Sequence, residues 1–419
     1  MMKRFFFLLS GMLLMQQSFA SMILIPMDQK QSDHLKAYGV AYWILAKGIK
    51  LDWMLNYRGG SFAFPNFSEG ENECVVRGVS YEVVPDVQYN GILAEIANPE
   101  VNQDVVKLEK APKVAVYSPK NKRPWDDAVT MVLTYAEIPY ELIYDDDVLE
   151  GKLPLYDWLH LHHEDFTGQY GRFYAAYANA PWYIEDVKLQ ETTAAKWGFT
   201  KVSQLKLAVA KNIRAYVSGG GFMFAMCSAT DSYDIALAAE GIDICEWMYD
   251  GDGQDPAAQQ KLDFSQCFAF QNFTLVRDPM TYEFSNIDAT NTRRVPMDQD
   301  YFTLFDFSAK WDPVPTMLCQ DHTQLIKGFM GQTTAFRNET MKPATLVMGE
   351  NKSVGEARYV HGEYGHGTWT FYGGHDPEDY QHQVGDPPTD LALHPNSPGY
   401  RLILNNVLFP AAKKKKQKT

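Results

Sequence analysis

The stretch Gly219-Gly-Gly-Phe-Met-Phe-Ala-Met-Cys227-Ser-Ala-Thr-Asp-Ser232 decides the fold that we expect. It follows a segment, 205–217, whose apolar residues recur with helical spacing, and glycine is common where a helix ends. The apolar run 222–226 predicts a buried strand. Thr230, Asp231 or Ser232 can then cap a second helix over 230–239. Cys227 therefore falls at the turn between a strand and a helix.

The same alternation of strand and helix extends in both directions from this turn. Apolar runs predict strands at 22–26, 51–55, 113–117, 140–144, 156–162, 345–348 and 368–372, with a closing helix over 400–408. The order of strand, polar loop, helix and strand occurs once before residue 98 and again after residue 112. Such alternation predicts an α/β fold with a mainly parallel sheet that helices cover on both faces.

Changes in composition and proline-bounded polar stretches along the chain suggest its domain organisation. We expect a signal peptide at 1–20, a smaller N-terminal α/β lobe at 21–97 and a linker at 98–112. The main domain is expected at 113–410, with insertions at about 166–200 and 246–340, followed by a basic tail at 411–419. A chain of 419 residues exceeds what one hydrophobic core usually supports, which favours two units.

The first 20 residues have the three parts of a secretory signal peptide. Lys3 and Arg4 precede an apolar run over 5–15, and the triplet Ser18-Phe19-Ala20 offers small residues for cleavage. The apolar run is shorter than the roughly 20 residues of a spanning helix. We therefore expect export to the periplasm or the medium, a mature chain that begins near Ser21, and no membrane span.

The net charge limits the classes of molecule that the chain can bind, and the cysteine count bears on its free thiols. The formal net charge is -14, and removal of the leader with Lys3 and Arg4 makes it -14 - 2 = -16, so an acidic surface argues against binding nucleic acid. We expect a small-molecule or envelope substrate instead. The five cysteines are an odd number and show no CxxC spacing, so at least one thiol is expected to be free.

Cys227 is the first candidate for chemistry. The carboxyl end of a parallel strand is where open α/β sheets bind ligands. A helix that begins just after a cysteine lowers its pKa, and its N–H groups can stabilise an oxyanion. We therefore expect a nucleophile at Cys227, an oxyanion donor in the backbone N–H of Ser228, and Asp231 in the same pocket. The alternative is a buried structural cysteine.

His375 and Glu378 form the second candidate. They lie in the segment Tyr372-Gly-Gly-His-Asp-Pro-Glu378, which also follows an apolar strand. His375 is expected to act as a general base, with Glu378 or Asp376 orienting its ring. The alternative is a glycine- and proline-rich turn with a surface histidine.

A third candidate is His160-Leu-His-His-Glu-Asp165, which ends the strand expected at 156–162. His162, His163 and Glu164 are residue types that bind metals, and a metal-dependent hydrolase is one interpretation. The other interpretation is a polar strand end that lines a pocket. Because no second ligand motif stands out, we place these residues in the pocket and assign neither a metal nor a cofactor.

The two motifs around Cys227 and His375 resemble the class I glutamine amidotransferase-like superfamily, in which a turn cysteine, a histidine and a glutamate form a triad. The segments GGGFMFAMCSATDS and GGHDPEDY are closest to its trehalose-utilisation (ThuA-like) branch. The resemblance covers about 110–240 and 345–410 and implies a flavodoxin-like domain. Ala225 and Ala229 replace the glycines of the amidotransferase turn, and the histidine-to-glutamate spacing is three residues instead of two.

The mature chain also resembles a group of exported proteins that carry the label asparagine synthetase B. An enzyme of that type uses an N-terminal cysteine and an SGGxDS pyrophosphatase loop. The mature chain would begin at Ser21, and Ser218-Gly-Gly-Gly-Phe-Met lacks the Asp-Ser pair.

The expected function is therefore an exported, Cys-dependent amidohydrolase that acts on an amide or peptide-like envelope substrate through Cys227, His375 and Glu378. The alternatives are a carbohydrate- or peptide-binding protein without catalytic activity and a metal-dependent hydrolase.

Overall fold

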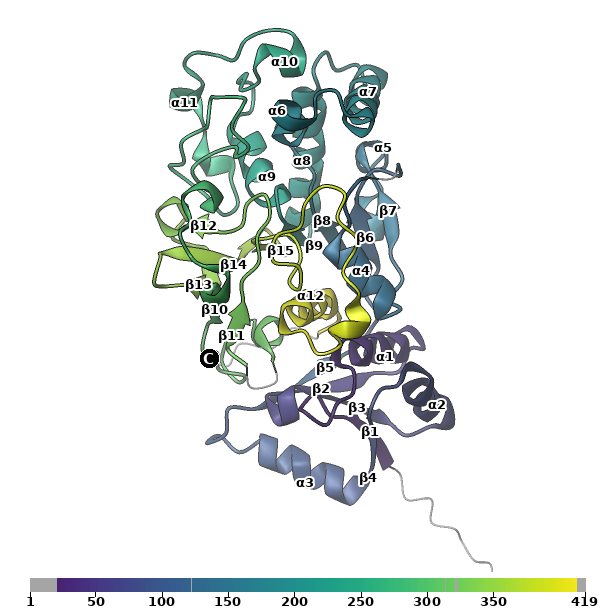
Figure 1. The fold of residues 1–419 in the computed structure, drawn as a ribbon. Helices are drawn as coiled ribbons and strands as arrows, with labels where there is room; N and C mark the ends of the chain where they lie inside the picture. Colours follow the sequence, from purple (N-terminus) through teal and green to yellow (C-terminus); the bar gives the residue numbers. More distant parts are fainter. Residues whose placement is uncertain (1–20, 122, 313, 321–322, 413–419) are drawn as a thin grey trace, which may run out of the picture.

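The computed structural model describes residues 21–121, 123–312, 314–320 and 323–412 (Figure 1). The expected signal peptide and most of the basic tail lie outside these residues. The described chain forms two β-sheets with helices packed around them. The smaller sheet belongs to the N-terminal part of the chain and the larger one to the remainder.

The N-terminal sheet has five strands in the order β4-β1-β3-β2-β5, and all of its pairs are antiparallel. Helix α3 packs against one face, and α1 packs between the other face and the larger unit (Figure 1). The elements are β1 (Ser21–Ile25), α1 (His34–Ala46), β2 (Leu51–Leu55), β3 (Ser61–Pro65), α2 (Ser68–Arg77), β4 (Glu82–Pro85), α3 (Asp86–Ile96) and β5 (Asp104–Leu108).

A tight connection explains why β2 and β3 pair antiparallel. Strands β2 and β3 are joined by residues 56–60, in which Asn56, Arg58, Gly59 and Gly60 all have positive φ. A parallel pair needs a crossover of a dozen or more residues, so a link this short produces a hairpin. Strand β5 lies within the segment 98–112, which we expected to be a linker, and pairs with β2.

The larger sheet contains a parallel part of five strands, in the order β15-β9-β8-β6-β7. These strands are β6 (Val114–Tyr117), β7 (Glu141–Ile143), β8 (Trp158–Leu161), β9 (Phe222–Met226) and β15 (Gly367–Tyr372). Their carboxyl ends face the same edge of the sheet, and this edge carries the candidate site.

An antiparallel part continues the same sheet beyond β15. It consists of β10 (Tyr301–Leu304), β11 (Leu325–Lys327), β12 (Phe336–Arg337), β13 (Leu346–Asn351) and β14 (Glu356–Tyr364). The prediction of a flavodoxin-like, mainly parallel sheet is therefore wrong. Only four of the strand pairs formed by the described residues are parallel, and the fold is mixed α/β with mostly antiparallel pairing.

Helices cover both faces of the parallel strands. Alternate side chains of β6, β8 and β9 point to opposite faces, so α4 and α12 pack on one face while α5, α8 and α9 pack on the other. The helices are α4 (Ala128–Tyr135), α5 (Asp145–Leu149), α6 (Tyr174–Tyr177), α7 (Pro181–Lys196), α8 (Val202–Ser218), α9 (Ala229–Ala238), α10 (Trp247–Asp250), α11 (Ala258–Lys261) and α12 (Pro398–Leu408).

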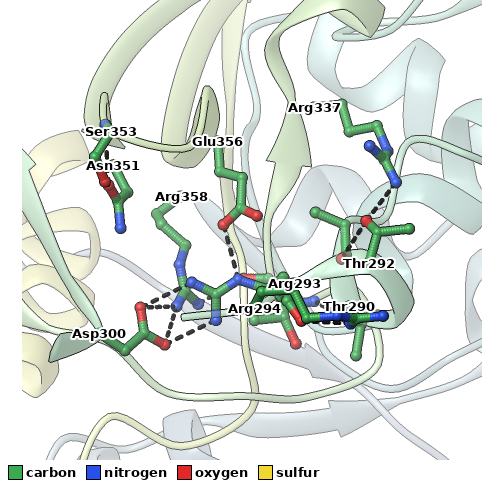
Figure 2. Close-up of polar contacts among 12 residues, drawn as sticks. Thr290, Thr292, Arg293, Arg294, Asp300, Arg337, Asn351, Ser353, Glu356 and Arg358 are labelled. Carbon is green, nitrogen blue, oxygen red and sulfur yellow. Dashed lines mark hydrogen bonds and ion pairs between the residues drawn. The ribbon is translucent and has the colours of Figure 1, made fainter. Parts of the chain in front are cut away.

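A buried charge network attaches the insertion to the sheet (Figure 2). Asp300 accepts hydrogen bonds from both Arg293 and Arg358, and Arg293 also pairs with Glu356. Arg358, on β14, is fully buried and also donates to the backbone oxygens of Phe329 and Thr334. These bonds fix the ends of the segment 329–334, which reaches the candidate site.

Two further features bear on the expectations from sequence. No helix of the described residues is long and apolar enough to cross a membrane. All five cysteines lie within the described residues, and each is a buried free thiol.

Candidate metal centre

The candidate site lies where four neighbouring strands of the parallel part end. His162 and His163 follow β8, and Cys227 follows β9. His375 comes three residues after β15, and Asp127 caps α4 at the end of the loop that follows β6. Because parallel strands present their carboxyl ends together, residues far apart in sequence meet at this edge.

Cys227 occupies a strained turn. Its φ of 53° places it in the left-handed region, which a non-glycine residue occupies at a cost of about 1–3 kcal/mol. The backbone N–H groups of Ser228 and Gln332 donate to the Cys227 sulfur. Two separate segments therefore hold the Cys227 thiol in place.

The start of α9 holds the segment that carries the two adjacent histidines. The Ser228 hydroxyl donates to the backbone oxygen of His163 at 2.8 Å. The backbone N–H of Ala229 donates to the oxygen of His162 at 3.0 Å. The first turn of a helix has N–H groups without partners inside the helix, and here they fix the position of the imidazoles.

His375 is held by a backbone ladder with the segment 329–334. Its N–H donates to the oxygen of Met330 at 2.9 Å, and the N–H of Gly374 donates to Thr333 at 3.0 Å. Gly374 has a φ of 101°, and a Cβ there would lie 2.4 Å from the Phe329 ring. Glycine is therefore required where the chain turns to present His375.

Three imidazoles and one thiol converge at the centre of the site. One ligand atom from each of His162, His163, Cys227 and His375 lies within 4.8 Å of the other three. The rings of His162 and His163 are stacked with centroids 3.5 Å apart, and the His375 ring lies 4.9 and 4.8 Å from them. We call these four residues the His3Cys cluster.

The imidazoles of His162 and His163 are neutral and expose bare nitrogen atoms. Burial lowers the pKa of His162 to about 4, despite the opposing effect of Asp127. Burial and the neighbouring imidazole of His162 lower the pKa of His163 well below its usual range. The Nε2 atoms of both rings are buried and have no hydrogen-bond partner among the described residues.

The Cys227 thiol is protonated in the absence of a cation. Burial raises its pKa to about 12, against the opposing effect of the N–H groups of Ser228 and Gln332. The sequence indicated a more acidic thiol because α9 begins close by. The structure differs because the sulfur is buried, and the two carboxyl groups of Asp288 and Asp231 also raise its pKa.

Two adjacent carboxylates contact the outer side of the imidazoles. Asp127 Oδ1 lies 3.2 Å from His162 Nδ1, and its Oδ2 lies 3.3 Å from His160 Nε2. Asp126 Oδ1 lies 3.1 Å from His375 Nε2. Histidines that ligate metals usually contact a carboxylate or carbonyl through the second ring nitrogen. The contact between Asp127 and His162 follows this pattern and leaves Nε2 of His162 free.

Three of the residues expected in the site have other partners. Glu378, which was expected to orient His375, lies 3.2 Å from His394 instead. Glu164 accepts a hydrogen bond from Tyr144, and burial raises its pKa to about 7. Asp231 is fully buried and accepts a hydrogen bond from the Thr333 hydroxyl at 2.8 Å.

Asp126, Asp127 and His382 were not expected in the site from the sequence, although His160 belongs to the third candidate segment. Asp127 is the N-cap of α4, and Asp126 lies in the preceding loop. The available signal was the pair of aspartates just before an apolar helix, because aspartate is a preferred N-cap residue.

Aromatic side chains flank the cluster on one side. The Trp125 ring contacts His163, with centroids 5.7 Å apart, and also packs against Phe173 and Trp182. Phe173 in turn contacts Tyr282, whose side chain is 40% exposed. Four partly exposed rings from separate segments therefore extend from the His3Cys cluster towards solvent.

Comparisons with known proteins assign no family. No protein family matches the chain, and no curated protein matches it. Among solved structures, the cytoplasmic protein STM3548 from Salmonella typhimurium has a TM-score of 0.35 at 10% identity, covering 72% of this chain and 100% of that protein. The cytoplasmic protein STM1381 from Salmonella typhimurium LT2 has the same TM-score and coverage at 13% identity.

A third solved structure, Gan42B, is described as a GH42 beta-galactosidase. It has a TM-score of 0.27 at 10% identity, with 64% of this chain and 28% of that protein covered. Likeness at this level assigns neither the fold nor the function of this chain.

Proposed function

We propose that this chain is a metal-dependent hydrolase whose ion is bound by the His3Cys cluster. The observation that supports this proposal is the convergence of four ligand atoms within 4.8 Å of one another. Imidazole and thiolate are the ligands that zinc prefers in proteins. The Nε2 atoms of His162 and His163 have no hydrogen-bond partner among the described residues, so an ion there would displace no existing bond.

A bound cation also accounts for the protonation of the site. Without it, the site buries a thiol with a raised pKa beside imidazoles that make no hydrogen bond through Nε2. A metal ion deprotonates a thiol that coordinates it, and it provides the partner that the imidazoles lack. The N–H groups of Ser228 and Gln332 would then donate to a thiolate, which strengthens both bonds.

Hydrolysis is the reaction that such a site performs most directly. A bound zinc ion lowers the pKa of water to about 7 and polarises a carbonyl or phosphoryl oxygen. Zinc in a catalytic site keeps a position for water or expands its coordination during the reaction. The aromatic rings beyond Trp125 provide a surface against which a substrate can pack, which supports a catalytic role over a purely structural one.

The test of this proposal compares the metal-loaded and the metal-free protein. The purified protein is stripped with a chelator and assayed on a panel of nitrophenyl esters, amides and phosphoesters before and after zinc is returned. We expect activity to disappear and to return with the metal. The variant His163→Ala should lose the ion, whereas His366→Ala, in an exposed turn, serves as the control. Undiminished activity in the fully stripped protein would refute the proposal.

A Cys-dependent amidohydrolase is the second candidate. The left-handed turn at Cys227, with two N–H groups directed at the sulfur, favours a nucleophile presented at a sheet edge. In this case Asp126 takes the role that the sequence gave to Glu378. The stripped protein would then stay active, and iodoacetamide would inactivate it by modifying Cys227. The metal proposal predicts the reverse, because the ion protects the thiol.

A further inference from the structure

Asp126, His375 and His382 form a second group of metal-binding side chains next to the His3Cys cluster. One ligand atom from each lies within 4.8 Å of the other two. The rings of His375 and His382 are stacked with centroids 4.6 Å apart. The side chains of His382, His375 and Asp126 are only 3%, 8% and 11% exposed. The three donors are therefore enclosed by protein.

The ring orientation of His382 leaves a lone pair that points at a carboxylate. Its Nδ1 lies 2.9 Å from Asp379 Oδ2, and a carboxylate can only accept, so the proton of the neutral ring sits on Nδ1. Nε2 is then an acceptor, yet it lies 3.3 Å from Asp126 Oδ1, which is also an acceptor. Two acceptors at this distance repel unless a positive charge lies between them.

Two atoms in this group are left without partners. Among the described residues, neither His382 Nε2 nor Asp126 Oδ2 makes a hydrogen bond, although both atoms are buried. His375 faces the same carboxylate, because its Nε2 lies 3.1 Å from Asp126 Oδ1, and this contact places a proton on Nε2 that an ion would have to displace. A buried polar atom without a partner costs about 1–3 kcal/mol, so a group with two such atoms calls for a ligand.

We propose that Asp126, His375 and His382 bind a second divalent transition-metal ion. The site shares His375 with the His3Cys cluster, and this sharing rests on the function proposed above. A neutral imidazole has one nitrogen with a free lone pair, so His375 would serve both ions as an imidazolate, with its ring proton released to solvent as the second ion binds. Two imidazoles and one carboxylate, without sulfur, suit zinc, manganese or iron. Asp379 fixes the orientation of the His382 ring, as an outer carboxylate does at known metal sites.

Two ions at this edge would divide the work of hydrolysis. In sites with two metals, one ion stabilises the attacking oxygen and the other the leaving oxygen. The site without sulfur is the harder of the two and prefers oxygen ligands such as water or a substrate carboxylate. The second ion therefore extends the proposed function to a centre with two metals.

The absence of sulfur from the second site makes the two ions separable by spectroscopy. The stripped full-length chain is titrated with Co²⁺, and bound cobalt is counted after dialysis. Of the two proposed sites, only the His3Cys cluster can produce a thiolate-to-cobalt charge-transfer band. We expect two ions per chain, of which only one contributes to this band.

Substitution of His382 should remove one ion and leave the band. His382→Ala is expected to bind one Co²⁺ and to keep the charge-transfer band. The control His394→Ala, whose imidazole contacts Glu378 outside both groups, should bind two ions. If His382→Ala does not fold, Asp379→Asn decides the question. It removes the outer carboxylate and should lower the affinity for the second ion about 10- to 100-fold, while the charge-transfer band persists.

Each remaining outcome refutes one proposal. One ion per wild-type chain with the band intact, unchanged by His382→Ala or Asp379→Asn, overturns the second site and leaves the hydrolase proposal standing. In that case a proton on His382, instead of a metal ion, separates it from Asp126. No bound cobalt and no band in the wild-type chain would overturn the proposed function itself.

Discussion

The hydroxyl of Ser228 donates to the backbone oxygen of His163 at 2.8 Å, and this bond joins two of the segments that build the candidate site. Cys227 directly precedes Ser228, and His162 directly precedes His163, so both halves of the His3Cys cluster depend on the same contact. The serine therefore holds the thiol and the two imidazoles in register without itself being a metal ligand.

We predict that Ser228→Ala weakens both metal binding and folding. The substitution leaves the His163 oxygen without its side-chain donor and should lower the free energy of unfolding by about 0.5–1.5 kcal/mol. Zinc affinity, measured by competition with a chromophoric chelator, should fall with it. Ser228→Thr keeps the hydroxyl and should retain most of the affinity. An alanine variant with wild-type affinity and stability would show that the contact is dispensable.

Asp127 allows its two roles to be separated. Its side chain caps α4 by accepting from the N–H of Thr130, and it also contacts His162 and His160. Asp127→Asn should keep the cap but lower zinc affinity about 10- to 100-fold, since the outer carboxylate is lost. Asp127→Ala should in addition lower the free energy of unfolding by about 0.5–2 kcal/mol. Equal zinc affinity in wild type and both variants would contradict this assignment.

His361 predicts how the stability of the metal-free protein depends on pH. It is buried on β14 beside Thr370, and burial lowers its pKa to about 4, against 6.5 in the unfolded chain. Between these values the unfolded state binds more protons, so stability falls as the pH is lowered. From pH 8 to pH 5 this residue should account for a loss of about 2 kcal/mol, at 1.36 kcal/mol per pH unit.

The measurement is urea denaturation of the wild type and of His361→Gln at both pH values. A loss of stability that is the same at both pH values cancels, because only the change in the free energy of unfolding between the two values is compared. Wild type should lose about 2 kcal/mol more than the variant on acidification. An identical loss in both proteins would show that His361 is not a buried neutral group.

The sequence predicted the surroundings of Cys227 better than the remainder of the chain. The expected strand 222–226 and the helices 205–217, 230–239 and 400–408 agree with β9, α8, α9 and α12 within a few residues. These segments are apolar with one clear period, and glycine or a capping residue ends them. Because these segments are buried, their pattern of apolar residues fits only one type of secondary structure.

The antiparallel strands were harder to predict because their pairing depends on turns and not on apolar pattern. Neither β14 nor β3 is among the strands that the apolar runs predict. Both pair through short connections, and such connections reverse the direction of the next strand. The expectation of a mainly parallel sheet is therefore wrong in the part of the chain where short loops set the direction of each strand.

The candidate site likewise contains residues that the sequence predicted and residues that it did not. The rule that ligands gather at the carboxyl ends of parallel strands pointed to Cys227, His375, His162 and His163, which the structure brings together. The rule contains no information on loops that return from a distance. His382 and Asp126 reach the site through irregular segments, and Glu378 is turned towards His394, so neither outcome followed from residue spacing.

Export of the chain remains a prediction from composition. The expected cleavage site leaves Ser21 as the first residue, and Ser21 is also the first residue of β1, where its backbone oxygen accepts from the N–H of Asn66. Cleavage there would leave the N-terminal sheet intact. N-terminal sequencing of protein recovered from the cell envelope should find Ser21 or a near neighbour. Recovery of the chain with Met1 intact would contradict export by a cleaved signal.

Zinc-edge X-ray absorption is the most direct test of the His3Cys cluster. The stripped chain is loaded with one equivalent of zinc, and the spectra of wild type and Cys227→Ser are compared. Cys267→Ser, a buried cysteine outside the cluster, serves as the control. We predict one sulfur at about 2.3 Å and two or three imidazole nitrogens at about 2.0–2.1 Å, with the sulfur absent only in Cys227→Ser. A wild-type spectrum that contains only nitrogen and oxygen ligands would contradict the account.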